Sequence, residues 1–135
     1  MKRNVTILLL VILATTGFNA HASTSDTALI GTWKGTSICQ IKPSACNDEI
    51  AVYHITKGSK AGTFHVVANK VINGKEEDMA QSDFTFNAAD NSFTSYIEEY
   101  KVTIKLIVKG NSMEGTLMND KTVYRIIKLK KTSSN

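Results

Sequence analysis

The segment YKVTIKLIVK, residues 100–109, decides the fold. Its apolar side chains recur at every second position from Tyr100 to Val108, and mostly polar side chains fill the positions between them. A period of two is typical of a β-strand that buries one face and exposes the other. The same alternation returns near the end of the chain, where one face carries Val123, Arg125, Ile127 and Leu129.

Shorter segments of the same kind fill the rest of the chain, and residues that favour turns, such as Asn73-Gly74, separate them. About eight short strands without a long helical stretch indicate an all-β barrel or sandwich. We predict an up-and-down antiparallel barrel, because closure removes the exposed edge strands. Residues 76–81 are predicted to form a helical turn or a solvated loop. The predicted strands are 30–40, 49–57, 62–72, 82–87, 92–98, 99–109, 112–118 and 121–131.

The first 22 residues have the pattern of a secretory signal peptide. A positive start at Lys2 and Arg3 precedes an apolar run, and Ala20-His21-Ala22 supplies small residues before the expected cleavage at Ser23. The run is shorter than the roughly 20 apolar residues that a membrane anchor needs. We therefore expect a periplasmic or secreted protein without a membrane anchor, with 23–135 as a single β-barrel domain.

The two cysteines, Cys39 and Cys46, enclose a short loop that contains the only proline, Pro43. In an oxidising compartment two nearby cysteines usually form a structural disulfide. A redox pair usually has closer C-x-x-C spacing, and a metal site would have to recruit His54 or Glu49. We predict the disulfide and keep those two readings as alternatives.

Composition excludes one large class of partner. Hydrophobic residues make up 42% of the chain, which is enough for a packed core. The formal charge is +4, and loss of Lys2 and Arg3 leaves only a small positive excess. Since nucleic-acid surfaces carry a clustered basic stripe, we expect no nucleic-acid partner.

Gly31-Thr32-Trp33 opens the first predicted strand, and Arg125 lies in the last one. This arrangement resembles the lipocalins and their calycin relatives, in which a Gly-x-Trp begins an eight-stranded barrel and an Arg lies near the chain end. The resemblance implies that Arg125 packs across Trp33 and closes the bottom of the barrel, so both residues are structural. Avidins start with a similar strand but line their biotin site with several tryptophans, whereas Trp33 is alone here. An ordinary barrel with Trp33 in its core is the alternative.

The chain lacks the sequence motifs of common enzymes: it has no G-x-S-x-G, H-E-x-x-H, P-loop or G-x-G-x-x-G. Glu98 and Glu99 are adjacent, so on a strand they point to opposite faces and cannot act as a catalytic pair. His54 and His65 could serve as general bases, but the sequence offers neither a nucleophile nor a substrate group for them. We therefore expect no catalysis, no cofactor and no metal.

Small barrels hold one ligand or are filled by their own side chains. We predict that this barrel binds a small apolar or amphipathic molecule without transforming it, although the same apolar residues also describe a packed core. The predicted ligand-binding residues, on the inner or mouth-facing lining, are Val52, His54, Phe64, Val66, Phe84, Phe86, Tyr100, Ile104, Leu106 and Met113.

The alternative function is a protein-binding barrel, such as a periplasmic inhibitor of a lysozyme or a protease. Such a protein would plug the cleft of its target with a loop. The loop between Cys39 and Cys46, stiffened by Pro43 and followed by Asp48 and Glu49, would be the inserting element.

Overall fold

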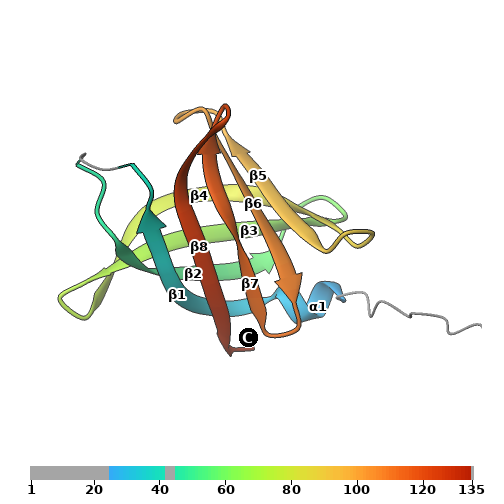
Figure 1. The fold of residues 1–135 in the computed structure, drawn as a ribbon. Helices are drawn as coiled ribbons and strands as arrows, with labels where there is room; N and C mark the ends of the chain where they lie inside the picture. The colour runs from blue at the N-terminus through green and yellow to red at the C-terminus, as the bar shows by residue number, and fades with distance from the viewer. Residues whose placement is uncertain (1–24, 42–44, 135) are drawn as a thin grey trace, which may run out of the picture.

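The computed structural model of the chain describes residues 25–41 and 45–134, so the predicted signal peptide lies outside the described residues. A short helix, α1 (Asp26–Leu29), precedes eight antiparallel strands that form a closed barrel (Figure 1). Each strand pairs with its neighbours in sequence, and β8 returns to pair with β1. The predicted eight-stranded up-and-down barrel is confirmed. The strands are β1 (Gly31–Cys39), β2 (Glu49–Lys57), β3 (Thr63–Ile72), β4 (Lys75–Asn87), β5 (Ser92–Ile97), β6 (Val102–Lys109), β7 (Ser112–Asn119) and β8 (Thr122–Ser133).

Residues 76–81 are part of β4, so the prediction of a helical turn or loop there is wrong. Glu76 lies opposite Val71, and Asp78 lies opposite Asn69, in a long β3–β4 hairpin. Its turn at Asn73-Gly74 has φ values of 51° and 76°, the left-handed pair that a tight hairpin turn requires. The cross-strand hydrogen bonds of this hairpin outweigh the low strand propensity of Glu and Asp.

The turn between β5 and β6 is longer than the sequence suggested. The backbone amide of Tyr100 donates to the carbonyl of Ile97 at 3.3 Å, and that of Lys101 donates to Glu98 at 3.2 Å. Lys101 has a φ of 50°, which ends the turn. Strand β6 therefore begins at Val102, and Tyr100 belongs to the turn rather than to the strand.

One end of the barrel is closed by α1 and Trp33. The indole Nε1 of Trp33 donates to the carbonyl of Leu29 at 2.9 Å, and both side chains are fully buried. The ammonium of Lys131 lies 5.8 Å from the centre of the Trp33 ring and donates to the carbonyl of Ala28 at 2.8 Å. Trp33 is therefore a structural residue that locks the helix onto the barrel.

The cation over Trp33 comes from Lys131, not from Arg125, so the expected Trp33–Arg125 stack is wrong. Strand register explains the difference, because Trp33 lies opposite Lys131 and Arg125 lies opposite Cys39 at the other end of β1. Arg125 does share its inward face with Ile127 and Leu129, as the alternation predicted.

Aromatic side chains fill the half of the barrel nearest Trp33. The rings of Phe84 and Phe93 are stacked with centroids 4.6 Å apart, and Phe64 meets Phe93 edge-on at 5.8 Å. All three side chains are almost fully buried. Aromatic pairs in these geometries stabilise a core beyond the area they bury. This half of the barrel is therefore a packed core.

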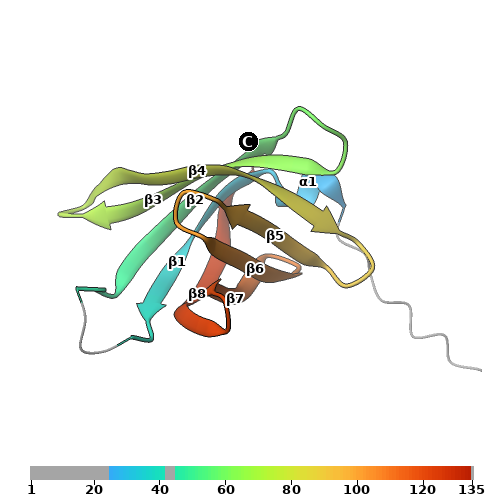
Figure 2. The ribbon, with the colours of Figure 1, turned by 90° about the horizontal axis from the view of Figure 1, so that it is seen from above.

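The opposite end of the barrel lies away from α1. The described parts of the β1–β2 connection and the β3–β4 hairpin both project on that side in the two views of the ribbon (Figures 1 and 2). Ser37, Glu49 and Arg125 also lie toward that end, which we call the mouth. The fold thus has one closed end and one mouth.

Candidate functional site

A cavity of about 250 Å³ occupies the mouth half of the barrel. It exists because small side chains meet at one level of the wall. Ala68 on β3 lies between Tyr53 on β2 and Ala80 on β4 in the strand register, and Ala51 lies two positions from Tyr53. Where Phe residues fill the closed half, alanines leave space here.

The cavity wall is mostly apolar, and its polar groups gather at one place. The apolar part is formed by Ala51, Ala68, Met79, Ala80, Ile97, Val102, Ile104, Leu117 and Ile127, together with the rings of Tyr53 and Tyr100. Ser37, Glu49 and Arg125 supply the polar part. An apolar pocket with a few convergent polar groups is the usual form of a small-molecule site. Its volume is slightly below the roughly 300–1,000 Å³ of typical ligand pockets.

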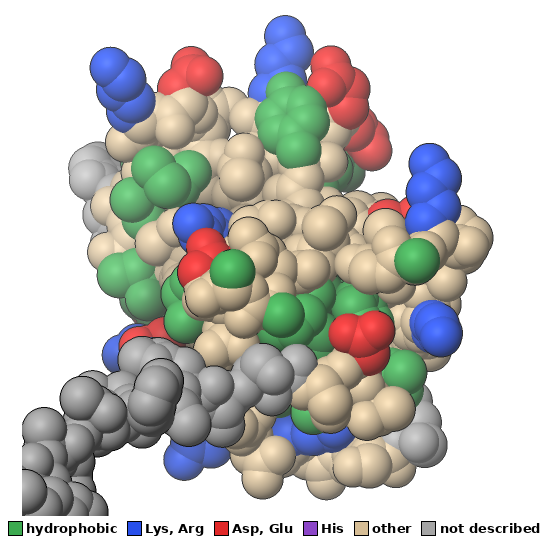
Figure 3. All heavy atoms as spheres, turned by 90° about the vertical axis from the view of Figure 1, so that its right-hand side faces the viewer, with side chains coloured by type: hydrophobic (Ala, Val, Ile, Leu, Met, Phe, Trp, Pro, Cys, Tyr) green, Lys and Arg blue, Asp and Glu red, His purple; other side chains and the backbone are tan. Residues whose placement is uncertain are grey.

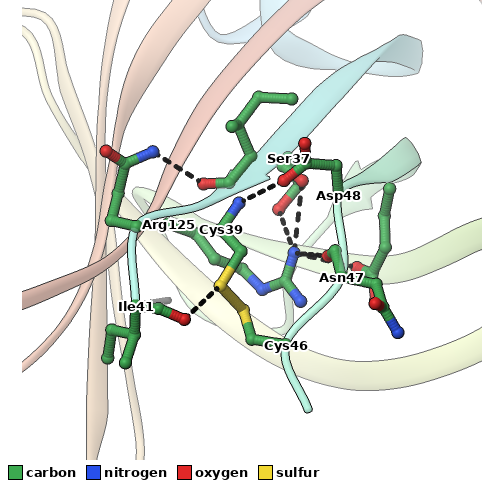
Figure 4. Close-up of a disulfide and its surroundings, with 10 residues drawn as sticks. Ser37, Cys39, Ile41, Cys46, Asn47, Asp48 and Arg125 are labelled. Carbon is green, nitrogen blue, oxygen red and sulfur yellow. Dashed lines mark hydrogen bonds and ion pairs between the residues drawn. A yellow bond between two sulfur atoms is a disulfide. The ribbon is translucent and has the colours of Figure 1, made fainter. Parts of the chain in front are cut away.

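Arg125 organises the polar part of the site (Figure 4). Its Nη1 donates to the carbonyl of Ser37 at 3.2 Å, to the Ser37 hydroxyl at 3.2 Å and to the carbonyl of Asn47 at 3.1 Å. The same nitrogen lies 3.3 Å from the Glu49 carboxylate, and only 17% of the Arg125 side chain and 21% of the Glu49 side chain are exposed. Two charges that are largely removed from water thus neutralise one another beside the cavity.

All of these contacts use one nitrogen of a guanidinium that carries five N–H donors. Within the described part of the chain, Nε and Nη2 of Arg125 have no hydrogen-bond partner. Arg125 therefore keeps N–H groups that can donate hydrogen bonds to an oxygen atom of a bound molecule.

Tyr53 adds a second free polar group. Burial raises the pKa of its phenol far above the ordinary value, the positive charge of Arg125 opposes that rise, and Glu49 adds to it. The phenol is thus protonated and able to donate at any physiological pH. No hydrogen bond links its hydroxyl to another described residue, although only 3% of the residue is exposed. Buried Tyr hydroxyls usually find a partner, and a ligand would supply one.

The disulfide between Cys39 and Cys46 is present, as predicted, and it lies beside this polar group (Figure 4). The backbone amide of Cys39 donates to the Asp48 carboxylate at 2.9 Å. The bridge and this hydrogen bond fix the start of β2, which carries Glu49. The predicted disulfide therefore helps to position the Arg125–Glu49 pair.

The ten residues predicted to bind a ligand fall into three groups. Tyr100 and Ile104 line the cavity. Six others belong to the packed core or lie against it: Phe64, Val66, Phe84, Phe86, Leu106 and Met113. Val52 and His54 face outward, because they lie opposite Lys34 and Thr32 while the inward Tyr53 lies opposite Trp33. Their expected inward or mouth-facing position is wrong, and contact of the other eight with a ligand stays a prediction.

His54 belongs to a polar network on the outside of the barrel. Its Nδ1 lies 3.2 Å from the Thr32 hydroxyl, and its Nε2 lies 2.6 Å from the Glu76 carboxylate. Glu76 also accepts from the Asn69 amide at 2.9 Å. These hydrogen bonds from His54 and Asn69 lower the pKa of Glu76 below its ordinary value. A hydroxyl, an imidazole and a carboxylate in line resemble a hydrolytic triad, but none of them lines the cavity.

His65 also faces outward, where its Nδ1 lies 3.0 Å from the Asp83 carboxylate. Both partners are substantially exposed, which makes the pair a surface ion pair of small energetic weight. Among the described residues, no group of three His, Cys, Asp or Glu side chains is arranged to hold a metal ion.

Sequence reasoning missed Tyr53, Glu49 and the alanines as site residues. Residues 50–55 are nearly all apolar, so alternation alone does not tell which face of β2 points inward. The register between Trp33 and Tyr53 decides it. The sequence feature that could have indicated the cavity is the set of small residues Ala51, Ala68 and Ala80, since small side chains leave space when they meet inside a barrel.

No protein-family model matches the chain, and a search of curated proteins also finds no match. Among the described residues, no helix is long and apolar enough to cross a membrane.

Proposed function

We propose that this chain is a lipocalin-like barrel that binds a small amphipathic molecule in its mouth without transforming it. The observation that carries the proposal is the cavity of about 250 Å³, with an apolar wall and the Arg125–Glu49 pair at one side. Its volume suits the apolar part of a small molecule. The polar part of the molecule would lie against the free N–H groups of Arg125 and the Tyr53 hydroxyl. An oxygen atom there could accept hydrogen bonds from both residues.

The lipocalin-like part of the proposal draws support from the closed end. A Trp at the start of β1 is covered by a cationic side chain from β8, where the resemblance implies an arginine. The cation is Lys131, six residues after the arginine expected there. The same packing role is thus filled by a different residue.

The alternative, a protein inhibitor that inserts the disulfide loop, has weaker support. Asp48 would belong to the inserting element, but its carboxylate accepts a hydrogen bond from the Cys39 amide. Glu49 is occupied by Arg125. The two acidic side chains that would approach a target are therefore held within the barrel's own hydrogen-bond network.

The test is a titration with a fluorescent amphipathic probe that bears a carboxylate on an alkyl chain. We expect binding to the unchanged protein and a loss of affinity of at least about tenfold in Ala68→Phe, since a phenyl ring there fills the cavity. Ala88→Phe is the matched control, because Ala88 is exposed in the β4–β5 turn. Equal affinity in all three proteins would place the probe elsewhere and contradict the proposed site.

A further inference from the structure

The outer face of β6, β7, β8 and β1 carries most of its charge as lysine. These four strands face the viewer in Figure 1. Their inward residues belong to the core or line the cavity, so the alternate residues point to solvent. Glu114 is the one acidic side chain among those outward positions. The outward lysines are Lys34, Lys105, Lys109, Lys128 and Lys130. We call the outer surface of these four strands the lysine face.

The lysines lie close together and are only partly offset by acidic groups: Glu114 lies opposite Lys128, Lys105 acts electrostatically on Asp90, and Lys34 acts on Glu76. Lys34 and Lys130 are directly opposite one another on β1 and β8, and Lys128 lies two positions along β8. Like charges directly opposite on neighbouring strands destabilise a sheet. None of the five lysines forms an ion pair with a residue that the structure describes, and all five are exposed. The face therefore holds a positive charge that an external partner can neutralise.

Apolar side chains share this face. Ile38 and Ile126 lie opposite one another on β1 and β8, and their exposed fractions are 36% and 37%. They sit toward the mouth, next in sequence to Ser37 and Arg125 of the cavity. Exposed isoleucines beside lysines form a surface that is both basic and apolar.

Charge is segregated around the barrel. The outward positions of β4, which is not one of the four strands of the lysine face, carry Glu76, Asp78 and Asp83, and of these Glu76 is within electrostatic reach of Lys34. The end that carries α1 shows basic, acidic and apolar side chains interspersed (Figure 3). The lysine excess thus belongs to one face and does not follow from net charge alone.

We propose that the lysine face binds peripherally to a lipid bilayer rich in anionic headgroups. The lysines would lie at the phosphate level, and the two isoleucines would enter the interfacial region. The charge is spread over four neighbouring strands of the barrel wall, so several lysines can approach one lipid surface together. An acidic polysaccharide offers the exposed isoleucines no apolar surface to contact, whereas a bilayer does. A bilayer therefore fits the observed side chains better. This contact would also bring the mouth close to the bilayer.

The test is sedimentation of the protein with vesicles of phosphatidylcholine alone or mixed with phosphatidylglycerol. All variants are made in the same full chain, so that residues outside the described part contribute equally. The test variant combines Lys109→Gln, Lys128→Gln and Lys130→Gln. Lys34 is left unchanged because its charge also helps to lower the pKa of Glu76. The matched control combines Lys57→Gln, Lys60→Gln and Lys75→Gln, which removes the same charge from exposed positions elsewhere.

We expect binding to the anionic vesicles, little binding to the neutral ones, and a roughly 100-fold weaker partition for the test variant. The control variant should bind nearly as well as the unchanged protein, and Ile126→Ser should weaken binding without abolishing it. Circular dichroism would verify that each variant is folded. Equal losses in the test and control variants would overturn the proposal. Binding to heparin without binding to anionic vesicles would also overturn it and would indicate an acidic polymer as the partner.

Discussion

Trp33→Ala is expected to lower the free energy of unfolding by about 3–5 kcal/mol, the cost of removing a fully buried tryptophan. The ring is 0% exposed and holds α1 through its hydrogen bond to Leu29. Its loss leaves a cavity at the closed end and a buried carbonyl without its donor. Urea denaturation followed by circular dichroism measures the change.

Lys131→Met is the control for that experiment. It keeps the length of the side chain but removes the charge over the Trp33 ring and the hydrogen bond to Ala28. We expect a smaller loss of about 1 kcal/mol. If Trp33→Ala cost less than Lys131→Met, the closed end would not depend on the packing of the indole.

Arg125→Ala is expected to destabilise the protein by about 2–3 kcal/mol, because it leaves Glu49 largely out of water without a counter-charge. It also removes the donor to Ser37 and Asn47. The double variant Arg125→Ala/Glu49→Ala should recover part of that loss, since no unpaired charge remains. Denaturation of four proteins, the unchanged chain, Arg125→Ala, Glu49→Ala and the double variant, gives the coupling energy of the pair.

The fluorescence of Trp33 separates the two possible roles of Arg125. Arg125→Ala should leave the Trp33 emission unchanged, whereas Lys131→Met should shift it, because Lys131 covers the ring. A shift in Arg125→Ala with none in Lys131→Met would restore the stack of Arg125 on Trp33. No coupling between Arg125 and Glu49 would show that their contact adds nothing to stability.

The fold could be predicted from the sequence because its strands have one buried and one solvated face. Strand β6 shows this most clearly, since Val102, Ile104, Leu106 and Val108 are all buried and the alternate lysines are exposed. The turn at Asn73-Gly74 was also recognisable from residue type alone. In these places local preference and tertiary structure agree.

The mouth site could not be predicted in the same way, because it depends on register. In residues 50–55 both faces of β2 are apolar, and Val52 is 2% exposed although it points outward between Lys34 and Asn69. Val52 is thus apolar and buried on the outer face of β2, so residue type alone does not show which face of this strand points into the barrel. A one-residue change of register exchanges the two faces, so Tyr53 and His54 could be told apart only in the assembled barrel.

The resemblance to lipocalins implied that Arg125 covers Trp33, and this is wrong because Lys131 lies over the ring. Arg125 is the only arginine after residue 3, which made it the obvious choice. Position along β8 decides the partner, and Arg125 lies six residues from the level of Trp33. Its charge instead meets Glu49 at the mouth.

A ligand site in the mouth of the barrel is tested most directly by native mass spectrometry of the protein purified from cells that express the full chain, together with its Ala68→Phe variant. We expect one small amphipathic molecule bound to each unchanged chain, released on denaturation and missing from Ala68→Phe. The same small molecule on both proteins, or none on the unchanged protein with no affinity for added amphipathic probes, would contradict a ligand site in the mouth of the barrel.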